Sequence, residues 1–174
     1  SGQSGHGPSR MTRNDRTLAV GIDFGSSGCR AIAIDPDGTV QGEVSLPLPP
    51  PVRHGTGVEQ EPAVWSTALD DLLGRLVRTV PAGHIGAIAV DATSGTVLLA
   101  DAAGNPLGRA LMYNDGRATT EAATIAAVAP RESAAHGTAS GLAKLLWLLK
   151  QPGAGQAAYL LTQTDYLNGL LGGR

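Results

Sequence analysis

The sequence has 174 residues, a formal net charge of −2 and a hydrophobic content of 42%, which suits one α/β domain better than a disordered or fibrous chain. The basic residues are scattered and no apolar run approaches the roughly 20 residues of a membrane span, so we expect neither nucleic acid nor a membrane as partner. Cys29 is the single cysteine, which excludes an internal disulfide, and without a secretory signal a cytoplasmic protein is expected.

The start of the chain predicts a leader followed by an antiparallel meander. Residues 1–10 are mostly Gly, Ser and polar types without periodicity, and we interpret them as a tag or disordered leader. Alternating apolar residues then predict three strands, at Leu18–Asp23, Arg30–Asp35 and Thr39–Ser45. Tight turns between these strands, one of them carrying the hairpin signal Asp37-Gly38, make the meander antiparallel.

Helices and further strands follow in the rest of the chain. Pro62 is placed to open a helix whose apolar residues recur at helical spacing as far as Val80. The nearly all-apolar stretch His84–Asp91 predicts a strand buried on both faces. The remaining predictions are a strand at Thr96–Ala100 and helices at Gly116–Val128, Leu142–Lys150 and Tyr159–Leu171. Periodicity alone therefore predicts a mixed α/β domain, and its order differs from the doubly wound dinucleotide topology.

The segment Gly21–Asp35 has the chemistry of an anion site. Its candidate residues are Asp23, Gly25, Ser26, Ser27, Gly28 and Arg30. The two glycines let the backbone approach a phosphate, and the two serines add hydroxyl donors. The aspartate is suited to hold Mg²⁺ through water, and the arginine to meet the transferring phosphoryl group. A Gly-Ser turn can also be only a turn, and a strand-end aspartate only a cap; two other nucleotide signatures, the P-loop and G-x-G-x-x-G, are absent.

These residues resemble the first phosphate motif, D-x-G-T/S-T/S-S-x-R, of the FGGY carbohydrate kinases, the family of glycerol kinase, xylulokinase and ribulokinase. Later stretches resemble that family in the same order. They are the helix start Glu59–Trp65, the strand-loop-strand Ile88–Asp101, the A-L-x-W/Y-x-D-x-R segment Ala110–Ala118, and the helices at Leu142–Leu149 and Thr164–Leu167. The loop Asp91–Val97 lacks the glutamine-rich loops of xylulokinase and glycerol kinase and is more similar to the D-ribulokinase-like and related pseudokinase branch. For the chain as a whole, the D-ribulokinase-like or xylulokinase-like branch is the most similar.

The resemblance implies a ribonuclease-H-like (actin-like ATPase) α/β domain with a mixed sheet that starts with the antiparallel meander and has helices on both faces. It also implies ATP and Mg²⁺ as cofactors and phosphorylation of a small sugar or polyol, such as the ketopentoses D-ribulose or xylulose. Asp23 would hold the metal and Arg30 would be the catalytic arginine. The implied substrate contacts are Ser94, Tyr113, Asn114 and Asp115.

The family's general base and adenine-binding half lie later than the point where this sequence stops. We therefore expect residues 17–174 to form the N-terminal portion of the first kinase domain and to be inactive alone. The apolar helix Leu142–Leu149, if uncovered, would favour self-association or a homodimer. The alternative is a non-catalytic sugar-binding protein or pseudokinase on the same fold. Another actin-like ATPase is a third reading, which the later matches argue against.

Overall fold

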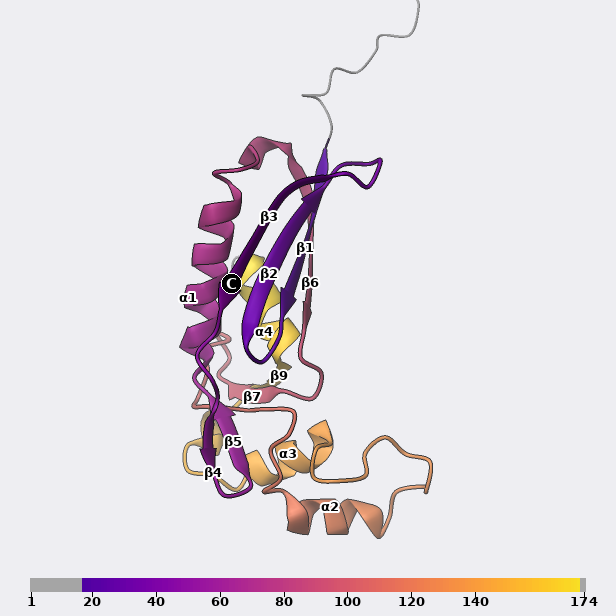
Figure 1. Ribbon diagram of the computed structural model, residues 1–174. Helices are drawn as coiled ribbons and strands as arrows, with labels where there is room; N and C mark the ends of the chain where they lie inside the picture. Colours follow the sequence, from indigo (N-terminus) through magenta and orange to yellow (C-terminus); the bar gives the residue numbers. More distant parts are fainter. Residues whose placement is uncertain (1–16, 173–174) are drawn as a thin grey trace, which may run out of the picture.

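The structure, a computed structural model, describes residues 17–172, so the predicted leader at 1–10 lies outside the described range (Figure 1). Its first sheet is formed by β1 (Leu18–Phe24), β2 (Gly28–Ile34), β3 (Val40–Pro47) and β6 (Ile85–Ala92). The strand order is β3-β2-β1-β6, with β1 antiparallel to β2, β2 antiparallel to β3, and β1 parallel to β6. The predicted meander followed by a helix and a parallel strand is therefore confirmed.

One face of this sheet is packed and the other is open. Side chains in β1 alternate between buried and exposed, and α1 (Pro62–Leu76) and α4 (Gln163–Leu171) lie against the buried side. In Figure 1, α4 lies behind the sheet and α1 runs along its β3 side. Helix α1 begins with proline and buries the stripe Trp65, Leu69, Leu72 and Leu76, the spacing of one helical face.

A second sheet of short strands continues the core at the carboxyl end of the first. Its strands are β4 (Val52–His54), β5 (Gly57–Gln60), β8 (Ala110–Leu111), β7 (Val97–Ala100) and β9 (Tyr159–Thr162), in that order and all antiparallel. Val58, Leu98 and Met112 pack into the same apolar cluster as the first sheet, so both sheets share one core. Helices α2 (Thr119–Ala126) and α3 (Gly141–Leu148) pack on each other beside the second sheet. Short 3₁₀ turns span Ala82–His84 and Ala154–Gln156.

Three expectations differ from this structure. Among residues 17–172, α1 and α4 cover only one face of the first sheet, so helices on both faces are not found there. Strand β6 was predicted to be buried on both faces, but most of its residues are exposed. The helix expected from Tyr159 begins at Gln163, because Tyr159–Thr162 pairs with β7 as β9 and Thr162 then caps α4 in a capping box with Asp165.

Candidate active site

The predicted phosphate turn joins β1 to β2 and is closed by its own hydrogen bonds. The Gly25 N–H donates to the Gly28 carbonyl at 2.9 Å, so this N–H already has a partner. The Leu48 N–H donates to the Ser27 carbonyl at 2.9 Å, which fixes the turn to the end of β3. Ser26 and Ser27 are exposed. The turn therefore presents the two serines to solvent from a fixed backbone.

Asp23, Arg30 and Asp91 come together on the open face of the first sheet. Asp23 lies opposite Arg30 in the β1–β2 ladder and opposite Asp91 in the parallel β1–β6 ladder, so the three side chains project from one face. All three are exposed, and they line a surface depression of about 390 Å³. The exposed Arg30 also forms an ion pair with Glu43 of β3, Nε to Oε1 at 3.5 Å.

Asp91 was not among the predicted site residues, because its strand was interpreted as fully buried. Its position carried a usable signal: it ends a strand that follows the first helix, and in this order of elements that strand lies parallel to β1. The carboxyl ends of neighbouring parallel strands meet at one edge of the sheet, where ligands commonly bind. Asp91 therefore belongs beside Asp23.

The donors at this edge fit Mg²⁺ bound largely through water. In-register residues on neighbouring strands are about 5 Å apart, so the carboxylates of Asp23 and Asp91 can approach one ion. Among the described residues no group of three or more His, Cys, Asp or Glu side chains could hold a metal. Mg²⁺ commonly takes one or two carboxylates and completes its shell with water and phosphate oxygens.

A direct contact joins the phosphate turn to the loop Asp91–Val97, which carries the predicted sugar contact Ser94 and whose residues 93–96 we call the sugar loop. Thr93 donates twice to the Phe24 carbonyl, from its backbone N–H at 3.1 Å and from its hydroxyl at 3.3 Å. Phe24 is the last residue of β1, directly before the turn. The two loops, about 70 residues apart in sequence, therefore lie next to one another.

The predicted sugar contacts separate into exposed and buried residues. Ser94, Tyr113 and Asn114 are exposed, with Tyr113 at 45%. The Tyr113 N–H donates to the Thr96 hydroxyl at 3.1 Å, which brings the segment 112–115 against the sugar loop. Gly95 has a φ of +76°, and a Cβ added to it would lie 3.8 Å from the Cβ of Tyr113, so the two loops are close there. The structure thus brings Ser94 and Tyr113 into neighbouring loops.

Asp115 has a different environment, because it is only 1% exposed and its carboxylate is already engaged. Its Oδ2 accepts hydrogen bonds from the Val58 N–H and from Nη2 of Arg117, both at 2.7 Å. Its Oδ1 accepts from the Arg117 backbone N–H at 3.1 Å. In this structure Asp115 therefore links the segment 112–115 to β5 and to Arg117.

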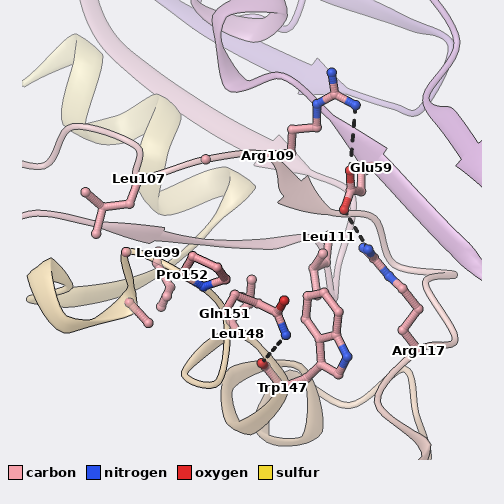
Figure 2. Close-up of a pocket in the computed structure, with 13 residues that line it drawn as sticks. Glu59, Leu99, Leu107, Arg109, Leu111, Arg117, Trp147, Leu148, Gln151 and Pro152 are labelled. Atoms are coloured by element: carbon pink, nitrogen blue, oxygen red, sulfur yellow. Dashed lines mark hydrogen bonds and ion pairs between the residues drawn. The ribbon is translucent and has the colours of Figure 1, made fainter.

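A separate cavity of about 340 Å³ lies between β7, β8 and the end of α3 (Figure 2). Figure 2 shows Glu59 between two arginines at this cavity, bound to Arg117 at 2.7 Å and to Arg109 at 3.8 Å. The Arg117 guanidinium also lies 4.4 Å above the Trp147 ring. The charged groups are thus paired with one another or stacked, and the cavity holds none of the predicted site residues.

No helix within residues 17–172 is both long enough and apolar enough to cross a membrane.

Comparison with known proteins identifies the class that this fold and site define. The family description "FGGY family of carbohydrate kinases, N-terminal domain" matches residues 18–174. Because the match covers nearly the whole sequence, the chain belongs to the FGGY family of carbohydrate kinases, and the actin-like α/β fold expected from the motifs is confirmed.

Individual relatives include several xylulose kinases. The chain is 30% identical to a xylulose kinase of Streptomyces coelicolor over 64% of this chain and 23% of the relative. It is 27% identical to a xylulose kinase of Klebsiella pneumoniae over 86% of this chain and 32% of the relative. The crystal structure of xylulose kinase from Rhodospirillum rubrum matches with a TM-score of 0.76 and 26% identity, over 87% of this chain and 33% of that one. The chain thus spans about a quarter to a third of the length of these relatives.

Proposed function

We propose that the protein carrying this chain transfers the γ-phosphoryl group of ATP to a hydroxyl of a small sugar or polyol, with a ketopentose such as xylulose or D-ribulose as substrate. Family membership and the similarity to xylulose kinases support the class of reaction. The observation that carries the proposal is the pair of hydrogen bonds from Thr93 to Phe24, which holds the sugar loop against the phosphate turn. Phosphoryl transfer requires this proximity of donor and acceptor.

On the phosphate side, the proposed roles follow from charge and exposure. Bound MgATP would supply the transferable phosphoryl group and neutralise part of its charge. Asp23 would hold Mg²⁺ through water, with Asp91 beside it as a second carboxylate. The hydroxyls of Ser26 and Ser27 would donate to phosphate oxygens. Arg30 forms its ion pair with Glu43 on the exposed surface. Because such pairs contribute little to stability, the arginine can turn toward the phosphoryl group at a small cost in free energy.

On the sugar side, three exposed residues remain as proposed contacts. Ser94 and Asn114 have side chains that can hydrogen-bond to substrate hydroxyls, and the exposed ring of Tyr113 can pack against the carbon face of a sugar. Asp115 was proposed as a fourth contact from the resemblance. Its buried and engaged carboxylate favours a supporting role for the segment that presents Tyr113 and Asn114.

We further propose that the 174-residue chain does not turn over alone, and that the general base and the adenine site belong to other parts of the whole protein. The chain then contributes the contacts to the phosphates and the sugar. Within it, Asp91 is a poor candidate for the base, because it lies beside Asp23 on the phosphate side of the site, away from the proposed sugar contacts.

The test is an assay of ADP release by the complete protein with MgATP and each of D-xylulose, D-ribulose and glycerol. We expect ADP release that depends on one ketopentose. Calorimetry with the same sugars and with MgATP decides between the kinase and the non-catalytic alternative. Binding of a sugar without binding of MgATP by the complete protein would favour the sugar-binding protein or pseudokinase.

A further inference from the structure

Lys144 is a buried lysine that no part of the proposed reaction uses. It lies in α3, its side chain is 0% exposed, and it ranks among the largest fully buried side chains of the described residues. Its Nζ donates to three backbone carbonyls, those of Gly95 at 2.7 Å, Met112 at 2.8 Å and Tyr113 at 3.1 Å. All three acceptors are neutral.

These carbonyls belong to the two loops that carry the proposed sugar contacts. Gly95 follows Ser94 directly, and Met112 and Tyr113 directly precede Asn114. The two loops also meet through the hydrogen bond from the Tyr113 N–H to the Thr96 hydroxyl. The ammonium group therefore lies behind the proposed sugar surface and contacts both of its halves.

The chemistry of an ammonium group suits this position better than that of other side chains. It has three N–H donors around one atom, which matches three carbonyl oxygens converging on one point. A glutamine amide has two donors in one plane, and an aliphatic side chain has none. Burying a charge here carries a cost, which shows in the pKa of Lys144: burial lowers it to about 8, although the nearby Asp115 charge raises it.

Helix α3 has other anchors, so the lysine is not required to hold the helix itself. The Ser140 hydroxyl caps the helix by accepting from the Ala143 N–H at 3.1 Å, and Ala143 and Leu148 are buried against neighbouring elements. Loss of the Lys144 donors would leave three loop carbonyls without these partners, while the apolar packing of the helix would remain.

We infer that Lys144 is a positioning residue that sets the spacing between Ser94 and the Tyr113–Asn114 pair by binding the carbonyls of both loops. This inference rests on the proposed function, because it assigns those residues to the sugar. It makes Lys144 a determinant of sugar affinity that does not touch the sugar.

The test compares Lys144→Met with Lys150→Met in the complete protein. Methionine is an unbranched side chain one atom shorter than lysine, so it keeps most of the apolar stem and removes the donors. Lys150 is the matched control, since it directly follows the same helix region and binds buried Glu121 at 2.6 Å, away from both loops. For Lys144→Met we expect the KM for the sugar to rise about tenfold or more, with the KM for ATP within about twofold of wild type. Lys150→Met should leave both values near wild type even if it lowers the melting temperature.

Equal changes in both KM values, or an unchanged sugar KM in a folded Lys144→Met protein, would overturn the inference. If Lys144→Met does not fold, Thr96→Val serves as the second variant. It removes only the hydroxyl acceptor for Tyr113, so it should also raise the sugar KM selectively, and a normal sugar KM would count against the positioning role.

Hydrogen exchange separates a failure of this inference from a failure of the proposed function. In Lys144→Met, amides in residues 93–96 and 112–116 should exchange faster than in wild type, while those of the phosphate turn, 25–28, should not change. Faster exchange in both loops of Lys144→Met, together with a wild-type protein that shows no sugar-dependent activity, would contradict the proposed function but support the loop contact. Unchanged exchange would contradict the loop contact itself.

Discussion

At the scale of single residues, Asp23 and Lys144 illustrate opposite uses of charge. Asp23 lies one residue before the end of β1, on the open face of the sheet and exposed to solvent, whereas the Lys144 ammonium is enclosed by backbone carbonyls. The exposed carboxylate can act on a ligand, and the buried ammonium acts on the protein.

Replacing Asp23 should therefore affect activity more than stability. We expect Asp23→Asn to lower kcat/KM of the complete protein by about 10²-fold to 10³-fold, because it removes the charge that we propose holds the metal. The melting temperature should stay near wild type, since the side chain is exposed. Asp70→Asn, at an exposed aspartate of α1, is the control and should change neither quantity. Full activity in Asp23→Asn would remove Asp23 from the site.

Lys144 should make stability depend on pH in a defined window. Its pKa is about 8 in the folded protein, against an ordinary value of 10.5, so between these values the unfolded chain binds more protons. The free energy of unfolding should then rise with pH, by at most about 1.4 kcal/mol per pH unit. Urea denaturation of wild type and Lys144→Met from pH 7.5 to 10 isolates this effect. The free energy of unfolding of wild type minus that of Lys144→Met should rise with pH. A difference that stays constant or falls as the pH rises would contradict this prediction.

At the scale of elements, the phosphate turn depends on one of its glycines for packing. A Cβ on Gly28 would lie 3.0 Å from the carbonyl oxygen of Leu46 in β3, closer than side chains normally approach. A Cβ on Gly25 would be 3.5 Å from the Gly28 carbonyl, an ordinary contact. We expect Gly28→Ala to lower the free energy of unfolding by about 1 kcal/mol and Gly25→Ala by less than about 0.5 kcal/mol. If urea denaturation shows the same loss of unfolding free energy for both variants, the close approach of β2 to β3 is not the reason for glycine at position 28.

The sequence predicted the long elements and missed the short ones for physical reasons. Alternation in β1 and helical spacing in α1 extend over enough residues to define one period. Strands β4, β5 and β8 have two to four residues, too few for a pattern, and depend on pairing with distant segments. The apolar run of β6 fits a strand buried on one face or on both faces. Its sequence therefore could not show that one face of the strand would be left exposed.

The candidate site was predictable where its residues are adjacent in sequence. Asp23 and Arg30 belong to one turn and were found together, but Asp91 required the parallel pairing of β6 with β1. Lys144 carried no local signal at all, since a lysine in an apolar helix is commonly exposed. Its three acceptors are 31 to 49 residues away and come together only in the folded chain.

At the scale of the whole molecule, exposed apolar surface supports the prediction that the 174-residue chain self-associates. Leu142 and Leu149 of the α3 region are 45% and 49% exposed, and Ile88 is 43% exposed on β6, the last strand of its sheet among the described residues. Unpaired strand edges and apolar patches favour association. Sedimentation velocity over increasing concentration should show a rising average mass, which Ile88→Lys should reduce. A monomer at every concentration would contradict this prediction.

The central claim is that this chain supplies the phosphate and sugar contacts of a sugar kinase. Its most direct test is ADP release by the complete protein with MgATP, measured with and without D-xylulose or D-ribulose. The account predicts that ADP release requires the ketopentose and is largely lost in Asp23→Asn. Absence of ADP release with every sugar of the panel, or release that is independent of sugar, would contradict it.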